Sequence, residues 1–464
     1  MSKRLFKGIV AVLIANIINM FFNVVTNFAL PKYLSIDSYS YIKTFQLYSG
    51  YIGIFALGYS DGMYIKYGGR NLNEIGKNEI EKGLGTLRVL MLLESLLFIV
   101  ASQFLHNTVF KFFVFTLLSV NTIGYYKNLF QAIGEFRLYS RVLNVSTILK
   151  FISDMMLLFL IRTDNFKFYL LGYVLIDLLI WILLEYYFQN SYKTEIKKFL
   201  TFDYCLLLDN IKTGFLLMVG NFSSILLTGM DRWFIKWKMS NIEFAQYSFA
   251  VSLEGFLNVA ITPVTVTLYN YFCNHDEEKT VVSIRRIMFI FASLLIAAAF
   301  PAKFVIELLL DKYLESLKPL FILFGAQLFF TPNKAIYINL YKAKGQQSIY
   351  FRRLLSVLMF GFASNYILFQ LYGFKESFAY ATMLSAIFWI TRSIFDFKEY
   401  RFELKEVFFC ICVIAVFLIC GFSMNAIVGM IVYVGTVGVL AFCVFREEII
   451  MAMSKIKGWL PKRA

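Results

Sequence analysis

Long runs of mainly apolar residues, interrupted by short polar stretches, follow one another along almost the whole chain. A helix needs roughly 20 such residues to cross a bilayer. The pattern predicts an all-α polytopic membrane protein with about 14 transmembrane helices. The predicted spans cover residues 9–30, 40–59, 83–105, 109–130, 139–161, 167–188, 213–236, 243–270, 284–306, 317–337, 348–371, 377–395, 405–422 and 426–445.

The composition agrees with this pattern, because 59% of the 464 residues are hydrophobic and only 16% are charged. Soluble domains are typically about 45–50% apolar and about 25% charged. The connections between the runs are short, and they leave no room for a soluble catalytic domain or for the large external loop of a glycan polymerase. No phosphate-binding Gly-x-x-x-x-Gly-Lys-Ser/Thr motif occurs. We therefore predict that the chain is not an enzyme.

The formal net charge of +15 is distributed over short loops, so positive-inside bias explains it and no nucleic-acid partner is predicted. With the N-terminus inside, about 32 of the 45 Lys and Arg residues fall in cytoplasmic segments and about 12 in external ones. This asymmetry predicts an even number of spans with both chain ends in the cytoplasm.

An internal repeat is visible at an offset of 205 residues, where Gly50 matches Gly255. Six predicted spans separate the copies, which makes the halves parallel repeats. The repeat predicts a six-helix lobe over 1–200, a second six-helix lobe over 201–400, and a two-helix hairpin with a basic tail over 401–464.

Polar side chains form a stripe on the first helix of each predicted lobe, since a spacing of three or four residues places them on one helical face. Two interpretations remain open: hydrogen bonds that hold neighbouring helices together, or a water-filled substrate path between the lobes. The stripes consist of Asn16, Asn19, Asn23 and Asn27 in the first lobe, and of Asn221, Ser224, Thr228 and Arg232 in the second.

Charged residues inside the spans are candidates for function, because an ionisable group in hydrocarbon is costly. Lys150 is the only cation predicted near the midplane, and we expect it to bind an anionic substrate group unless it merely neutralises Asp154, one turn away. The acids Glu94, Asp177 and Glu254 are candidates for coupling to H+ or Na+; no other cofactor and no metal is predicted.

Basic residues near the inner ends of spans have two interpretations, contact with a substrate phosphate or anchoring at the membrane surface. They are Arg88, Arg352 and Arg353. Pro263 lies within the eighth predicted span and should kink that helix, as a hinge or simply as shape.

Several short motifs resemble one known family. They are Met230-Asp231-Arg232-Trp233-Phe234-Ile235, Phe244-Ala245-Gln246-Tyr247-Ser248 and Ile261-Thr262-Pro263, with Leu30-Pro31-Lys32-Tyr33-Leu34 and Gly58-Tyr59-Ser60-Asp61-Gly62 near the N-terminus. Together with the parallel repeat, they resemble the polysaccharide-transporter branch of the multidrug/oligosaccharidyl-lipid/polysaccharide exporter superfamily, the Wzx-type flippases.

This resemblance implies a multi-pass flippase of the bacterial plasma (inner) membrane. Its substrate would be a polyprenyl-diphosphate-linked glycan for O-antigen, capsule or exopolysaccharide, moved by alternating access among membrane lipids, with a glycan polymerase of the same pathway as a further partner. Asp231 and Arg232 would form a gating pair at the outer end of the seventh span. The weakly cationic midplane favours a neutral or zwitterionic glycan. A cation-coupled multidrug antiporter of the same superfamily and a peptidoglycan lipid-precursor flippase remain the alternatives.

Overall fold

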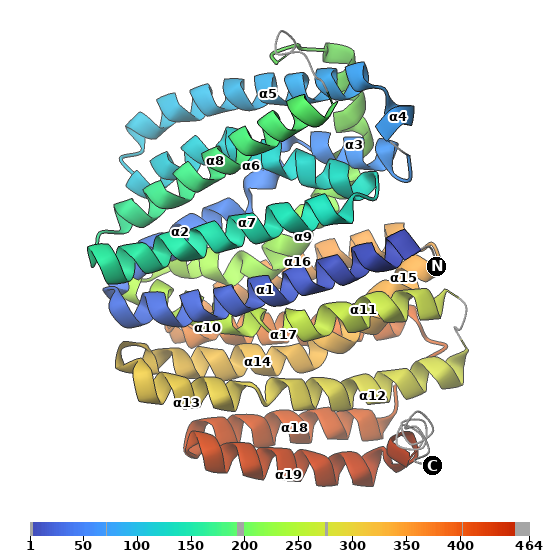
Figure 1. Ribbon diagram of the computed structural model, residues 1–464. Helices are drawn as coiled ribbons and strands as arrows, with labels where there is room; N and C mark the ends of the chain where they lie inside the picture. Colours follow the sequence, from blue (N-terminus) through green and yellow to red (C-terminus); the bar gives the residue numbers. More distant parts are fainter. Residues whose placement is uncertain (1–2, 71, 193–198, 274–276, 401, 451–464) are drawn as a thin grey trace, which may run out of the picture. The chain divides into compact units, whose positions relative to one another are not determined.

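The computed structural model describes residues 3–70, 72–192, 199–273, 277–400 and 402–450. These residues form helices joined by short connections, and no strand occurs in the described ranges. Figure 1 shows the helices in their order along the chain. The all-helical fold class predicted from the sequence is confirmed. The basic tail predicted beyond residue 450 lies outside the described residues.

The chain divides into two compact units, unit 1 over Met1–Leu226 and unit 2 over Leu227–Ala464. The boundary falls inside the helix α9. The helices up to this boundary are α1 (Lys3–Tyr33), α2 (Ile36–Gly50), η1 (Ile52–Ala56), α3 (Tyr59–Tyr67), α4 (Leu72–Ile75), α5 (Lys77–Phe104), α6 (Thr108–Ala132), α7 (Phe136–Met155), η2 (Met156–Ile161), α8 (Phe166–Tyr192) and α9 (Tyr204–Lys238).

Unit 2 continues from α9 and includes the C-terminal hairpin α18–α19, which packs on α12, α13 and α14. Its helices are α10 (Asn241–Gly255), α11 (Asn258–Phe272), α12 (Glu278–Ile296), α13 (Ala299–Leu309), η4 (Asp311–Ser316), α14 (Leu317–Pro332), η5 (Asn333–Tyr337), α15 (Ile338–Ala343), α16 (Gln347–Tyr372), α17 (Glu376–Asp396), α18 (Leu404–Ser423) and α19 (Ala426–Val444).

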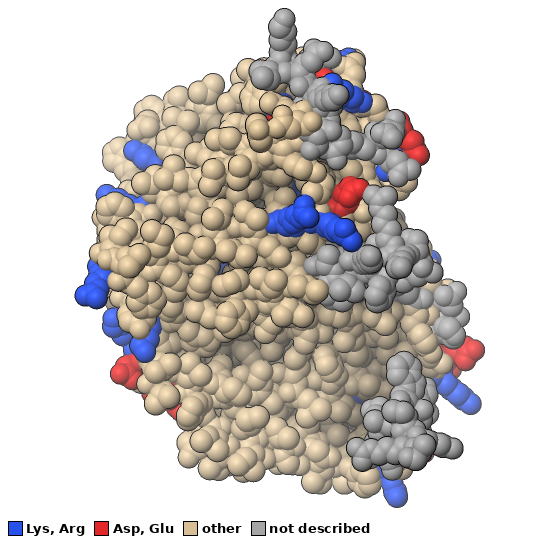
Figure 2. All heavy atoms as spheres, viewed as in Figure 1, with Lys and Arg blue, Asp and Glu red and all other residues tan. Residues whose placement is uncertain are grey.

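Twelve helical segments in the described residues are long and apolar enough to cross a membrane, and the bent pair α10–α11 makes a thirteenth. The surface agrees, because large apolar side chains such as Leu97 and Met359 are exposed on these helices. On the face seen in Figure 2, charged side chains gather near the helix ends. The chain is therefore a multi-pass membrane protein.

Thirteen of the predicted spans coincide with these segments, and the span predicted over 40–59 does not. That stretch is divided between α2, the short 3-10 helix η1 and α3, and none of the three meets the length of a span. The break occurs where Leu57 and Gly58 adopt left-handed backbone angles, with φ of 50° and 81°. A hydropathy window averages over such a break and therefore cannot detect it.

The predicted 205-residue repeat has a clear structural counterpart in the second helix of each copy. Both α2 and α10 contain 15 residues, and they end at Gly50 and Gly255. Each begins after a serine whose side chain accepts a hydrogen bond from the third residue of the helix, Ser35 in one copy and Ser240 in the other. Such caps satisfy N–H groups that have no partner in the helix. The duplication thus preserves the signals that begin and end these helices.

One helix lies at the centre of each unit. In unit 1, α6 packs against α2, α3, α5, α7 and α8. In unit 2, α14 packs against α10, α12, α13, α17 and α18, and nearly all its residues are buried. Both helices carry large aromatic side chains at buried positions, such as Tyr125 and Phe321. These rings bury a large apolar area, which stabilises the packing around each central helix.

Each unit also contains a buried arginine that links a membrane helix to the segment following the lobe's last helix. In unit 1, Arg88 forms an ion pair of 2.6 Å with Glu185 and donates to the carbonyl of Phe199 at 3.0 Å. In unit 2, the fully buried Arg285 pairs with Glu406 at 2.9 Å and donates to the carbonyl of Tyr400 at 2.8 Å. A buried guanidinium needs such partners because its desolvation is costly.

Helices α3 and α9 approach each other closely through glycines of unit 1. A Cβ on Gly214 would lie 2.1 Å from the carbonyl oxygen of Gly58 and 2.2 Å from the amide nitrogen of Gly62. A Cβ on Gly62 would lie 2.0 Å from the carbonyl oxygen of Asn210. Small residues at this spacing allow two backbones to meet within a membrane. The Gly-x-x-x-Gly spacing of Gly58 and Gly62 therefore serves helix packing.

This contact predicts that Gly214→Ala destabilises the protein, because the added methyl group overlaps backbone atoms that cannot move independently. We expect the free energy of unfolding to fall by about 1–3 kcal/mol, measured as a lower thermal unfolding midpoint of the detergent-purified protein. Gly220→Ala, on the same helix, is the matched control because a Cβ there meets no atom within 4 Å. Equal midpoints for the two variants would contradict the packing role.

Candidate functional site

The most extensive group of charged side chains within the spans of unit 1 centres on Lys150 of α7. Its Nζ lies 2.8 Å from Oδ1 of Asp177 on the neighbouring helix α8. Asp177 is 7% exposed, whereas the Lys150 side chain is 34% exposed. Two candidates that are 27 positions apart in the sequence are thus brought into contact, and part of the Lys150 side chain remains exposed.

Asp154 is not the direct partner of Lys150, although the two lie on one helical face. The buried carboxylate of Asp154 accepts a hydrogen bond of 3.0 Å from the hydroxyl of Tyr173 on α8. The alternative in which Lys150 and Asp154 simply neutralise each other is therefore replaced by two separate contacts between α7 and α8. Because these helices pack together, both contacts also hold the helix pair in register.

The stripe on α1 contributes one direct contact to this polar interior. The amide oxygen of Asn27 accepts a hydrogen bond of 2.8 Å from Nζ of the buried Lys43 on α2. Asn27 also donates to the backbone carbonyl of Asn23 at 2.8 Å. Asn16 and Asn23 are exposed and Asn19 is half-buried. The stripe therefore combines one helix-to-helix hydrogen bond, from Lys43 to Asn27, with exposed amides at Asn16 and Asn23.

The stripe on α9 begins in unit 1, where Asn221 donates to Oδ1 of Asp61 on α3 at 3.4 Å. Ser224 and Thr228 are exposed on the same helix. Because the unit boundary falls between residues 226 and 227, Thr228 belongs to unit 2.

A cavity of about 310 Å³ lies in unit 1 beside the Asn221–Asp61 hydrogen bond. Its polar lining comes from α3, α6 and α9, and its aromatic lining comes from Tyr51 and Phe222, whose ring centroids are 5.9 Å apart. The polar residues that line it are Ser60, Asp61, Asn121, Lys127, Asn128 and Asn221.

Two lysines of this interior were missed in the sequence because they were assigned to loop charges. Lys127 lines the cavity and lies within electrostatic range of both Lys150 and Asp177. Lys43 is 7% exposed and donates to Asn27 and Gln46. Lys150 is thus accompanied by two further cations inside unit 1. The sequence did contain a signal that these lysines lie inside the protein, because both fall within or beside predicted spans and not at the centre of a polar stretch.

The predicted phosphate-binding arginines have different environments. Arg88 is buried and paired with Glu185, so it is neither an interfacial anchor nor an accessible cation. Arg353 makes a two-pronged contact with Asp396, with both nitrogen–oxygen distances at 2.6 Å. Arg352 is exposed on the same helix. Within unit 1, Arg88 and Lys150 bind different carboxylates, Glu185 and Asp177, while Arg352 and Arg353 belong to unit 2.

The acidic candidates have different environments. Glu94 is half-buried on α5, and its Oε2 has no hydrogen-bond partner among the described residues. Glu254, at the end of α10, accepts a hydrogen bond from Gln327 on α14. Asp231 is buried in unit 2, where it accepts from Tyr247 at 2.7 Å and from Thr382 at 3.3 Å.

The predicted Asp231–Arg232 gating pair has only a partial counterpart. Asp231 accepts a hydrogen bond of 2.7 Å from the backbone N–H of Arg232, whereas its side-chain partners come from α10 and α17. Asp231 therefore holds three helices of unit 2 together.

The expected kink at Pro263 is wrong in position. The segment bends by 42° at the break between α10 and α11, and Pro263 lies inside the continuous helix α11. The bend therefore precedes the proline, beside Gly255 and the hydrogen-bonded Glu254.

The interior of unit 1 has the chemistry needed to hold a polar, partly anionic group away from water. Ammonium groups bind phosphate as point charges, while the amides of Asn121, Asn128 and Asn221 can orient hydroxyl groups, and aromatic rings supply an apolar wall. Lys127 connects the two parts of this site, because it lines the cavity and interacts electrostatically with the Lys150–Asp177 pair.

Fold and site together define a multi-pass helical membrane protein with a polar cavity within its first unit. Among solved structures, the lipid II flippase MurJ in an inward closed conformation is similar, with 14% identity and a TM-score of 0.55; the match covers 94% of this chain and 99% of that one. The chain therefore shares the fold of MurJ over nearly the full length of both proteins.

Two transporters of the MATE type are also similar at lower scores. The Vibrio cholerae MATE transporter VcmN matches with 15% identity and a TM-score of 0.45, covering 86% of this chain and 98% of that one. An outward-facing multidrug resistance MATE transporter of the MOP superfamily matches with 10% identity and a TM-score of 0.45, covering 86% and 97%. No protein-family model and no curated protein matches the sequence.

The Lys150–Asp177 contact predicts that Lys150→Ala destabilises unit 1, because it leaves the carboxylate of Asp177 buried without its cation. We expect a loss of about 1–3 kcal/mol in the free energy of unfolding, measured by thermal unfolding in detergent. The exchanged double variant Lys150→Asp/Asp177→Lys should recover part of this loss, and Lys167→Ala, on the exposed start of α8, is the control. If Lys150→Ala unfolds like the control, the ion pair contributes nothing to stability.

Proposed function

We propose that this protein is a flippase of the multidrug/oligosaccharidyl-lipid/polysaccharide exporter superfamily that moves a lipid-linked glycan across the bacterial plasma membrane. The observation that carries the proposal is the polar, lysine-containing cavity within the spans of unit 1, in a fold shared with a lipid II flippase. A substrate of this class has a charged headgroup that must cross hydrocarbon and a lipid chain that never leaves it.

The more specific substrate we propose is a polyprenyl-diphosphate-linked oligosaccharide for O-antigen, capsule or exopolysaccharide assembly, as the motif resemblance implies. In this proposal, Lys150 and Lys127 attract the diphosphate. Asn121, Asn128 and Asn221 donate to sugar hydroxyls, and Tyr51 and Phe222 contact the apolar faces of the sugars. Asn16, Asn23, Ser224 and Thr228 continue the path along α1 and α9.

The charge of the cavity supports a glycan without strong acidity. Its lining contains one basic residue, Lys127, and one acidic residue, Asp61, beside uncharged amides. A polyanionic sugar chain would meet the carboxylate of Asp61, whereas neutral sugars would meet hydrogen-bonding groups. In this proposal, the diphosphate is balanced by Lys127 together with the nearby Lys150.

Reconstitution into liposomes tests the proposal directly. A fluorescent polyprenyl-diphosphate oligosaccharide in the inner leaflet is protected from an impermeant quencher until it is flipped. The purified protein should make nearly all of it accessible, and Lys150→Ala should slow this exchange about tenfold, equivalent to one lost charged contact. Lys167→Ala should match the native protein.

The exchanged variant Lys150→Asp/Asp177→Lys separates a transport role from a folding role. It should regain stability and remain slow in transport, because the cation has moved to α8. Labelled lipid II and a cationic dye are tested in the same liposomes. If the dye moves and neither lipid-linked probe does, the protein is a drug antiporter and not a flippase. If only lipid II moves, the substrate is the peptidoglycan precursor and not the glycan proposed here.

A further inference from the structure

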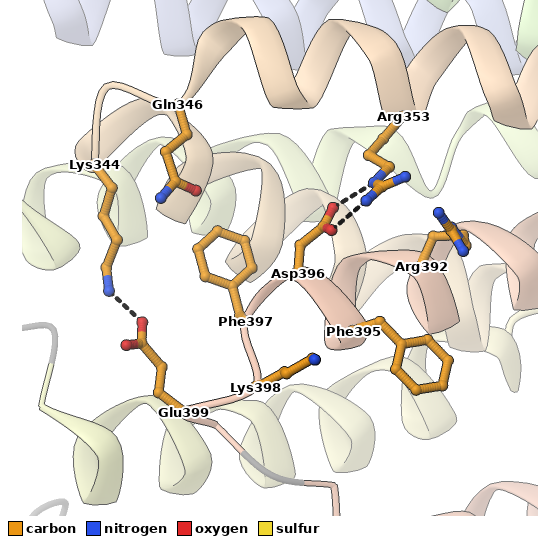
Figure 3. A pocket seen from close by; sticks show the side chains of 9 residues that line it. All are labelled: Lys344, Gln346, Arg353, Arg392, Phe395, Asp396, Phe397, Lys398 and Glu399. Atoms are coloured by element: carbon orange, nitrogen blue, oxygen red, sulfur yellow. Dashed lines mark hydrogen bonds and ion pairs between the residues drawn. The ribbon is translucent and has the colours of Figure 1, made fainter.

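A second cavity, of about 610 Å³, lies in unit 2 at the ends of α15 and α17 and the beginning of α16. Figure 3 shows the side chains that line it. Four of them are basic, Lys344, Arg353, Arg392 and Lys398, and two are acidic, Asp396 and Glu399. The lining therefore has a formal charge of +2 within a single cavity.

The two acids do not neutralise this cavity, because each is already held by one of the bases. Arg353 binds Asp396 through two nitrogen atoms, and Lys344 pairs with Glu399 (Figure 3). Arg392 and Lys398 make no ion pair with any carboxylate in the described part of the chain. The Nε of Arg392 is buried and has no hydrogen-bond partner there.

The backbone around the cavity also favours an anion. Helix α16 begins at Gln347, and the side chain of Gln346 before it makes no capping hydrogen bond, although it lines the cavity. The first N–H groups of a long helix attract negative charge. Lys344 stays positively charged. Burial lowers the pKa of its ammonium group, but hydrogen bonds with Glu399 and Tyr400 raise this pKa by more, so it lies above the ordinary lysine value.

An exposed apolar ring beside the cavity indicates that a phosphate group would reach it from the boundary between the membrane and water. Phe395 lines the cavity and is 61% exposed, at the end of a membrane-spanning helix. An apolar ring beside a cluster of cations matches the boundary between lipid headgroups and acyl chains. Anionic lipid headgroups attract Lys and Arg residues that cluster at the ends of membrane helices.

We propose that this cavity is a binding site for a phosphate group, and this proposal does not depend on the proposed transport function. Arg392 and Lys398 contact the phosphate oxygens, and the beginning of α16 orients it. The group is carried either by an anionic lipid headgroup or by a soluble phosphate compound. The same chemistry serves both, and the experiment distinguishes them.

Binding is measured on the purified full chain with three probes: phosphatidylglycerol, phosphatidylcholine and inorganic pyrophosphate. Native mass spectrometry counts bound lipid, and calorimetry measures pyrophosphate. Preference for phosphatidylglycerol over phosphatidylcholine identifies a lipid headgroup, whereas binding of pyrophosphate without a lipid preference identifies a soluble ligand. Arg392→Gln and Lys398→Gln should each weaken the preferred probe about tenfold, as expected for one charge-assisted contact.

Glu399→Gln provides a test in the opposite direction. It raises the formal charge of the cavity and releases Lys344, so binding of the preferred probe should become several-fold tighter. The control is Lys342→Gln, which removes one exposed charge at the same end of α15 without touching the cavity lining.

Lys398 is exposed, so its variant should fold even where Arg392→Gln does not. Equal binding of all probes by the native protein, Lys398→Gln and Glu399→Gln would overturn the proposal.

Discussion

Hydrocarbon offers a protein no hydrogen bonds, so every polar group within the membrane must find its partner inside the chain. The helices of this protein satisfy their own backbones, and several charged side chains between them are joined across helices. Arg285 with Glu406 and Lys150 with Asp177 show two forms of this solution. Lys303 shows a third, since its ammonium group binds the carbonyl oxygens of Gly421 and Met424 at the end of α18. The same pairs that make burial tolerable also determine which helices are neighbours.

The duplication in the sequence preserves structural signals more faithfully than it preserves polar chemistry. The serine caps and terminal glycines of α2 and α10 recur at one offset, and a buried arginine holds the connecting segment of each unit. The polar interiors differ in their direct contacts. Lys150 forms an ion pair with Asp177 in unit 1, whereas Asp231 and Glu254 in unit 2 accept hydrogen bonds from hydroxyl and amide groups, with Lys334 within electrostatic range of Glu254. The caps and turns shared by the two copies are therefore compatible with different polar side chains in each unit.

Hydropathy was sufficient to predict the fold class and thirteen span positions, because the requirement for apolar length is local in the sequence. The break at Leu57 and Gly58 escaped this approach, since backbone angles leave little trace in average hydropathy. For the candidate site, helical spacing placed Asn23 and Asn27 on one face, yet the partner of Lys150 depended on how α8 packs. Lys43 and Lys127 were missed for a related reason: a lysine near a span end looks like an anchor until the surrounding helices are known. Helix packing, which is a tertiary property, decided each of these cases.

The contact between Lys150 and Asp177 has a consequence for how tightly any anion can be held in unit 1. An incoming phosphate must compete with a carboxylate that is already 2.8 Å from the ammonium group. Binding is therefore an exchange of counter-ions, and its free energy is a difference between two similar attractions. Such an exchange would lower the affinity for the anion, because Asp177 competes for the ammonium group. It would also speed release, because Asp177 replaces the departing anion at once. A built-in competitor of this kind limits how long an anion can remain, which favours turnover over storage.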